Sequence, residues 1–312
     1  MTDALPVVPD EHHEHPTSAA TRTAMRVAVL GGDRREARVA VRLSKNGHTV
    51  NHFGTDLVSA QDVRVTESAE EAVAGARWIV CPAPGLGPDD SVFAPYATTP
   101  IVLDQRLLSH SDVHAGGIIL GRASPSLRTW AAKSGCRLFE TKDDPRLAEI
   151  VADAVAEELV AQMVRLTDRL LREVPVALLG FGATGRAIAK LLVSIGEPVW
   201  VAARRPEVLR EALALGAQQA VPYDRRAELF KDAGLIVNTA PDRRAISPDA
   251  FAAVGSTAVI DISSPPGGID HDAASAAGLT VIWARGLGGK RAPVTVGDAQ
   301  FEFARRIIEE EP

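Results

Sequence analysis

Short apolar runs alternate with segments whose apolar residues recur at helical spacing along most of this chain of 312 residues. Residues 26–30 form such a run, a Gly-Gly-Asp turn follows, and residues 35–45 show the helical period. Alternation of this kind is typical of parallel α/β architecture. It predicts further strands at 49–53, 78–81, 100–103, 117–120 and 137–139, and a helix at 126–134. We therefore expect residues 25–142 to form a Rossmann-like, doubly wound domain that binds substrate.

The spacing of apolar residues changes after residue 142. From 144 to about 172 they recur at helical spacing, with Pro145 placed to suit a first helical turn. This predicts a long connecting helix, followed by strands at 176–179, 199–202, 235–238, 258–262 and 280–283. Residues 143–295 would hold the helix and a second Rossmann-like domain, and a C-terminal helix at 296–312 would pack back on the first. We expect an α/β fold of two domains with a cleft between them.

A glycine-rich turn follows the first strand of the second predicted domain. Residues 176–190 read Val-Ala-Leu-Leu-Gly-Phe-Gly-Ala-Thr-Gly-Arg-Ala-Ile-Ala-Lys. Gly180 would allow the tight turn, Gly182 the approach of a pyrophosphate, and Gly185 the close packing of helix on strand. Ala183 and Thr184 would open the helix, whose N-terminus offers free N–H groups to phosphates. The context predicts a dinucleotide site; the alternative is a tight strand–helix turn that binds nothing.

The next strand ends in Ala203-Arg204-Arg205. NAD enzymes usually carry an acidic residue here for the ribose hydroxyls. Two guanidinium groups suit a 2′-phosphate instead, so we predict NADP(H) in preference to NAD(H), with Arg204 and Arg205 as ligands. The alternative for both is a solvated pair after a strand.

Composition narrows the class of protein. The chain is 46% hydrophobic and 24% charged, the balance of a globular protein, and its net charge of −6 gives no electrostatic case for nucleic acid or an anionic membrane. Two cysteines without metal-ligand spacing suggest a reduced, cytoplasmic protein, and no apolar run approaches a membrane span. Residues 1–24 are predicted to be a disordered tail whose histidines hold no functional metal.

Other loops follow predicted strand ends of the second domain, where a doubly wound sheet binds its ligand. Asn238, Thr239, Ala240 and Pro241 follow one strand, Asp261 ends the next, and Gly286 opens a glycine-rich loop before the last helix. We expect all of them to border the cofactor. Asp261 is also a candidate catalytic residue, although it could instead bind backbone amides in its own turn.

Taken in order, these motifs resemble those of the A subunit of bacterial dipicolinate synthase. The family's Gly-Gly-Asp-x-Arg turn is matched at 31–35, Gly-x-Gly-x-Thr-Gly at 180–185 and Ala-Arg at 203–204. Asn-Thr-x-Pro is matched at 238–241, Asp-x-x-Ser-x-Pro-Gly-Gly at 261–268, and Gly-Leu-x-Gly-x-x-Ala-Pro-x-Thr-x-Gly at 286–297. The order and spacing hold from about residue 27 to residue 307.

The resemblance implies an NADP-dependent dehydrogenase active in sporulation. Such a protein oxidises a dihydrodipicolinate-type precursor to pyridine-2,6-dicarboxylate and works with a flavoprotein-like partner, the B subunit of the synthase. We also expect a homo-oligomer. The chain departs from the family at 151–158, where Val-Ala-Asp-Ala-Val-Ala-Glu-Glu replaces Asn-Ser-x-Pro-Thr-x-Glu-Gly, and at Pro265, where the family often has Arg. A changed substrate, or a lost reaction, would account for both departures.

A dicarboxylate substrate requires cationic anchors and a proton acceptor. Arginines near predicted strand ends supply the candidate anchors, and Asp33 accompanies them in the first turn: Asp33, Arg34, Arg35, Arg122 and Arg285. Each arginine could equally be a surface charge. The candidate proton acceptors are His110 and His114, although either could equally be a solvated loop residue, and Glu157 is a further candidate catalytic residue.

Two other functions remain open. Asn238-Thr239-x-Pro241 is similar to a shikimate-dehydrogenase element, which allows a shikimate- or 2-hydroxyacid-dehydrogenase-like reductase. The altered segment at 151–158 allows a non-catalytic NADP-binding regulatory subunit.

Overall fold

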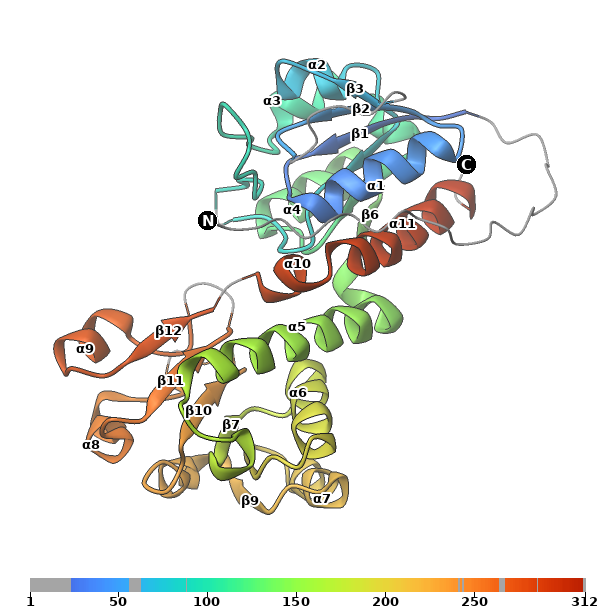
Figure 1. Ribbon diagram of the computed structural model, residues 1–312. Coiled ribbons are helices and arrows are strands. Elements are labelled where there is room, and N and C mark those ends of the chain that lie inside the picture. Colours follow the sequence, from blue (N-terminus) through green and yellow to red (C-terminus); the bar gives the residue numbers. More distant parts are fainter. Residues whose placement is uncertain are drawn as a thin grey trace.

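The computed structural model describes residues 24–55, 63–87, 89–240, 242, 244–263, 267–284 and 286–310. Two parallel six-stranded sheets stand one above the other in Figure 1, with helix α5 (Pro145–Leu166) crossing between them. This confirms the predicted fold class of two Rossmann-like units. The predicted tail lies outside the described residues, apart from residue 24.

The first sheet has the order β3-β2-β1-β4-β5-β6. Its strands are β1 (Arg26–Leu30), β2 (Thr49–Phe53), β3 (Val63–Val65), β4 (Trp78–Val80), β5 (Gly117–Leu120) and β6 (Leu138–Glu140). Its helices and single turns are α1 (Arg34–Lys45), α2 (Ala69–Val73), α3 (Gln105–Leu108), η1 (Val113–Ala115), α4 (Pro125–Ser134) and η2 (Thr141–Asp143). This order reverses direction between β1 and β4, which is the switch point where such sheets bind ligands.

The strand predicted at 100–103 is wrong. Ile101 and Leu103 are buried, but they fill the core from an irregular loop, and β4 pairs directly with β5 instead. The apolar residues at 100–103 therefore indicate burial and not strand pairing, and periodicity alone cannot distinguish the two. The short edge strand β3 was not predicted.

The second sheet has the order β12-β11-β10-β7-β8-β9, which is the same winding. Its strands are β7 (Val176–Leu179), β8 (Val199–Ala203), β9 (Gln219–Pro222), β10 (Leu235–Asn238), β11 (Ala258–Asp261) and β12 (Val281–Trp283). Its helices and turns are η3 (Leu171–Glu173), α6 (Ala183–Ser194), α7 (Pro206–Leu215), η4 (Tyr223–Leu229), η5 (Pro248–Ala250), α8 (Phe251–Val254) and α9 (His271–Ala276). Edge strand β9 was not predicted, because none of its residues is fully buried and its sequence therefore shows no apolar run.

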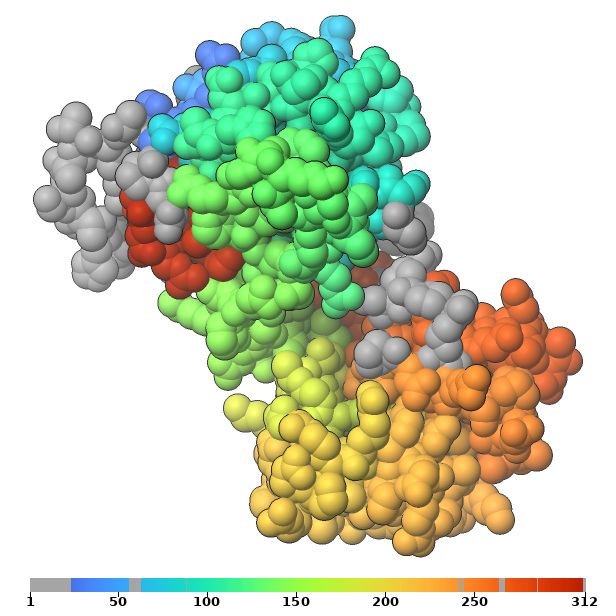
Figure 2. Space-filling view, turned by 180° about the vertical axis from the view of Figure 1, so that it is seen from behind, coloured from blue at the N-terminus to red at the C-terminus, as the bar shows by residue number. Residues whose placement is uncertain are grey.

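The C-terminal segment returns to the first sheet. Helix α10 (Leu287–Arg291) precedes α11 (Pro293–Glu310), and Figure 1 shows α11 lying beside α1. Phe301 and Ile308 of α11 share one core cluster with Val39 and Leu43 of α1. In Figure 2 the chain forms two lobes, one coloured blue to green and one yellow to orange. The predicted cleft between the domains stays a prediction.

Candidate functional site

The turn after β7 requires glycine at two places for steric reasons. Gly180 has a φ of 95°, and a Cβ there would lie 2.6 Å from the Thr239 hydroxyl oxygen. A Cβ at Gly185 would lie 2.4 Å from the carbonyl oxygen of Gly180. Gly182 differs, because a Cβ there would meet no atom within 4 Å. Its missing side chain therefore leaves open space beside the turn, which is what a ligand approaching the backbone needs.

Helix α6 begins in this turn without a side-chain cap. Gly182 is the N-cap residue, so no side chain satisfies the first N–H groups of the helix. Uncapped N–H groups and the positive end of the helix dipole favour an anion. A hollow of about 270 Å³ opens here. It is lined by the turn, the end of β8 and the loop after β10: Gly180, Phe181, Gly182, Ala183, Thr184, Gly185, Ala203, Arg204, Arg205, Val208, Tyr223, Thr239 and Ala240.

The two arginines after β8 differ in their surroundings. Both are exposed and border the hollow. A nitrogen of Arg205 lies 3.6 Å from a carboxylate oxygen of Glu207. Arg204 pairs with no carboxylate among the described residues; its guanidinium lies 5.8 Å from the centre of the Tyr223 ring. Arg204 is therefore the cation whose charge is left available to a ligand.

Tyr223, which the sequence did not single out, forms the far wall of the hollow. The ring is buried, and the guanidinium of Arg226 lies 4.6 Å from its centre. Arg226 also donates hydrogen bonds to the carbonyl oxygens of Tyr223, Arg244 and Ala245. Arg226 thus joins two loops and holds the ring in place. Only recognition of β9, whose end positions Tyr223, could have identified this residue from sequence.

The corresponding turn of the first sheet is closed by its own side chains. Asp33 caps α1 by accepting from the N–H of Arg35, and the Glu36 carboxylate accepts from the N–H of Asp33 at 2.9 Å. Burial raises the pKa of Glu36. Carboxylates thus occupy the position that a phosphate would take, so this turn does not suit a dinucleotide.

The predicted substrate residues Asp33 and Arg35 are engaged with each other. Arg35 Nε and Nη2 donate to the two Asp33 carboxylate oxygens at 2.8 and 2.9 Å. Burial alone would raise the pKa of Asp33, but the hydrogen bonds and charge of Arg35 outweigh it and lower that pKa. Because each charged group already has the other as its partner, we infer a structural role for the pair rather than substrate binding.

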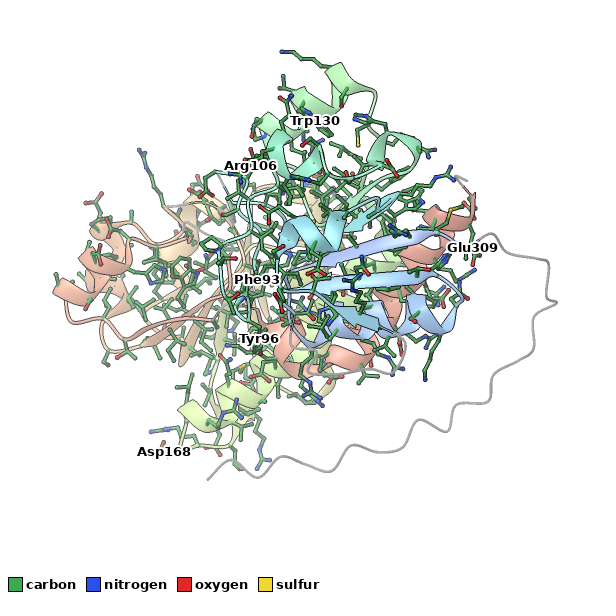
Figure 3. All side chains as sticks on the ribbon, turned by 90° about the horizontal axis from the view of Figure 1, so that it is seen from above. Phe93, Tyr96, Arg106, Trp130, Asp168 and Glu309 are labelled. Carbon is green, nitrogen blue, oxygen red and sulfur yellow. The ribbon has the colours of Figure 1, made fainter. Side chains whose placement is uncertain are left out.

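Arg34 and Arg122, by contrast, are exposed at the ends of β1 and β5. The loop that follows β4 adds two exposed aromatic side chains, Phe93 and Tyr96, which are 43% and 52% exposed and are labelled in Figure 3. Arg285 and Pro241 lie outside the described residues. The carboxyl edge of the first sheet therefore combines cations with aromatic surface.

The two candidate histidines lie apart from this edge. His110 and His114 precede β5 and so lie at the amino edge of the first sheet, where His114 packs against Trp130. In a parallel sheet this is the edge opposite the ligand. Glu157 lies on α5 and pairs with Arg291 of α10 at 3.1 Å. The placement of the two histidines argues against direct catalysis by either of them, whereas a role for Glu157 stays a prediction.

Asn238 and Asp261 are brought together at the ends of β10 and β11, where the Asn238 amide donates to the Asp261 carboxylate at 2.9 Å. Asp261 is fully buried and accepts further hydrogen bonds from the backbone of Ser263 and Gly268. This favours the alternative that Asp261 organises its own turn. Gly286 lies at the N-cap of α10 with a φ of 68° and does not line the hollow described above.

No described helix is both long and apolar enough to cross a membrane. Among the described residues, no three His, Cys, Asp or Glu side chains are grouped so that they could hold a metal ion.

Two doubly wound parallel sheets, a long helix between them and a glycine-rich turn that opens an uncapped helix define a Rossmann-like α/β protein with a candidate dinucleotide site. Residues 26–142 match the family model for the N-terminal domain of the dipicolinate synthase A subunit. The dipicolinate synthase A subunit of Bacillus subtilis (strain 168) is 25% identical over 295 residues, which cover 92% of this chain and 97% of that protein. The chain is therefore similar to the dipicolinate synthase A subunit over most of its length, which confirms the resemblance.

Solved structures show the same fold. The dipicolinate synthase A subunit from Bacillus halodurans aligns with a TM-score of 0.79 at 23% identity, covering 91% of this chain and 97% of the other. The apo structure of D-lactate dehydrogenase from Escherichia coli aligns with a TM-score of 0.61 at 15% identity, over 92% and 98% of the two chains. The arrangement of the sheets is thus shared with dehydrogenases.

Proposed function

We propose that this protein is an NADP-dependent dehydrogenase of the dipicolinate synthase type, which oxidises a dihydrodipicolinate-type precursor to pyridine-2,6-dicarboxylate. The observation that carries the proposal is the pairing of an uncapped helix N-terminus with the unneutralised guanidinium of Arg204 in one hollow. The helix N-terminus suits a pyrophosphate, and the Arg204 guanidinium suits a 2′-phosphate.

In this proposal the second domain binds the cofactor and the first domain binds the substrate. The turn at 180–185 would hold the pyrophosphate and Arg204 the 2′-phosphate, while Thr239 and Ala240 border the same hollow. A bound NADP⁺ would supply a hydride acceptor: the dihydro ring would lose one hydride to it and one proton to solvent, and aromatisation would drive the transfer. Arg34 and Arg122 are the arginines we assign to the two substrate carboxylates, because Arg35 is already paired.

Removing the Arg204 charge tests the cofactor assignment. We expect Arg204→Ala to weaken NADPH binding about tenfold or more, since a charge-assisted hydrogen bond contributes about 1.5–3 kcal/mol. NADH binding should change by less than about threefold because NADH lacks the 2′-phosphate. Fluorescence titration of the purified full chain with each cofactor measures both.

Arg205→Ala is the comparison variant, and its NADPH affinity should fall less than that of Arg204→Ala, because Arg205 has the Glu207 carboxylate 3.6 Å away and Arg204 has none among the described residues. Equal loss of both cofactors in the Arg204 variant would contradict its assignment. Turnover is then measured at 340 nm with NADP⁺ and freshly prepared dihydrodipicolinate, with and without the flavoprotein-like B subunit. NADPH binding without turnover in either mixture would favour a non-catalytic cofactor-binding role.

A further inference from the structure

Three neighbouring strands of the second sheet end on residues that share one register row. Asn238 of β10 pairs with Asp261 of β11, which in turn pairs with Trp283 of β12. In a parallel sheet the carboxyl ends lie at one edge, so these side chains meet where ligands bind. The row continues to Leu179, the last residue before the glycine-rich turn.

The Asp261 carboxylate is the centre of this row. Its Oδ1 accepts from Asn238 Nδ2 at 2.9 Å and from the Ser263 backbone N–H and hydroxyl at 3.0 and 2.6 Å. Its Oδ2 accepts from the Gly268 N–H at 2.8 Å and lies 3.3 Å from His271 Nε2. Because the side chain is fully buried and saturated with donors, it has no free lone pair with which to accept a proton from substrate.

Two loops take their shape from these hydrogen bonds. The Asn238 amide also donates to the Ala240 carbonyl, and its own carbonyl accepts from the Ala240 N–H at 3.1 Å. Ala240 in turn lines the hollow. A Cβ at Gly268 would lie 1.9 Å from Asn238 Nδ2, so the second loop presses directly on the first.

His271 and Trp283 close the network from the outer side. Their rings stack with centroids 4.7 Å apart, and Trp283 Nε1 donates to the Ser263 carbonyl at 3.0 Å. Described residues of the two loops that follow β10 and β11 are therefore hydrogen-bonded to the Asp261 carboxylate, either directly or through Asn238. Networks of this kind are rigid because an unpaired buried carboxylate is costly.

We propose that Asp261 is a positioning residue for the nicotinamide half of the cofactor. The inference rests on the proposed function, and it assigns the two halves of the dinucleotide to different strands. Arg204 and Tyr223 border the hollow on the β8–β9 side, which takes the adenosine half. The loops held by Asp261 follow β10 and β11, across the switch point, where the other half must lie.

The test compares NADPH with adenosine 2′,5′-bisphosphate, a probe that lacks the nicotinamide half. For Asp261→Asn in the full chain, we expect NADPH affinity to fall about tenfold and affinity for the bisphosphate to stay within about threefold. Equal weakening of both probes would show a merely structural role, and unchanged NADPH affinity would show none; either result overturns the proposal.

A second variant keeps the test decisive if Asp261→Asn fails to fold. Ser263→Ala leaves the carboxylate in place and removes the hydroxyl that donates to it at 2.6 Å from the loop after β11, and it should show the same split between the probes. Asp270→Asn is the matched control, because this exposed residue of the same loop only caps α9 and asparagine caps as well. If the wild-type chain binds neither probe, the proposed function itself fails, which is a distinct outcome.

Discussion

A single residue, Glu197, is expected to make the stability of the folded chain depend on pH. It lies in the turn between α6 and β8, it is only 4% exposed, and neither carboxylate oxygen has a hydrogen-bond partner among the described residues. Burial raises its pKa from 4.5 to about 7. A folded chain therefore holds a proton here at pH values where the unfolded chain has lost it.

The sign of the effect follows from this difference. Stability falls as the pH rises from about 4.5 to about 7 and is then constant with respect to this group. We expect Glu197→Gln to raise the free energy of unfolding by about 1–3 kcal/mol at pH 8 and to change it little at pH 4.5, because glutamine cannot ionise. Urea unfolding at both pH values measures this. An equal effect of Glu197→Gln at both pH values would contradict the argument.

At the scale of elements, α1 and α6 occupy the same place in their sheets but begin differently. Asp33 and Glu36 cap α1, whereas Gly182 leaves α6 uncapped. The two glycine-rich turns look alike in sequence, since both follow a buried apolar strand. The residues at the N-cap and at the third helical position therefore decide which helix N-terminus remains open to an anion. They are Asp33 and Glu36 in α1, and Gly182 and Gly185 in α6.

Truncating the α1 cap should therefore affect stability and leave cofactor binding intact. Asp33→Ala removes the cap and strands the buried Arg35 guanidinium, so we expect a loss of about 2–4 kcal/mol in the free energy of unfolding. Asp33→Asn keeps the cap and should cost less, about 1–2 kcal/mol. Denaturant unfolding measures the loss. A large change in NADPH affinity at a temperature where the variant is folded would mean that the first turn also serves the cofactor.

At the scale of the whole molecule, the C-terminal segment joins the two halves. Arg38 of α1 and Asp298 of α11 form a bidentate ion pair with distances of 2.7 and 3.1 Å across 260 residues of sequence. The Asp33–Arg35 pair contacts α10, because a Cβ at Gly289 would lie 2.7 Å from Arg35 Nε and 2.8 Å from Asp33 Oδ2. The absence of a side chain at Gly289 thus lets α10 dock on the first turn.

Neighbouring glycines of α10 provide a paired test of this docking. Gly289→Ala should destabilise the chain by about 1–3 kcal/mol because the new methyl group overlaps the Asp33–Arg35 ion pair. Gly288→Ala should be neutral or slightly stabilising, since a Cβ there meets its nearest atom at 3.5 Å and alanine favours helix. Thermal unfolding of the two variants compares them directly. Equal melting temperatures would show that α10 does not need this close approach.

Local patterns in the chain were enough to predict the parallel strands, the connecting helix and the glycine-rich turn. Each depends on residues close in sequence, such as the apolar run before Gly180 or the helical spacing after Pro145. The same patterns misassigned 100–103 and missed β3 and β9, because the pairing of a short strand depends on partners far along the chain.

Which polar groups remain available to a ligand was decided by the tertiary structure. Asp261 resembles a ligand-binding residue in sequence, but its carboxylate is saturated by donors such as the Asn238 amide, which lies 23 residues away and is brought to it by folding. Arg204 and Arg205 are adjacent and chemically identical, yet only Arg205 meets a carboxylate among the described residues. The sequence determines which hydrogen-bond donors and acceptors follow each strand. Which of them pair across different strands and helices depends on the distances between those elements, and these distances are fixed only when the sheets assemble.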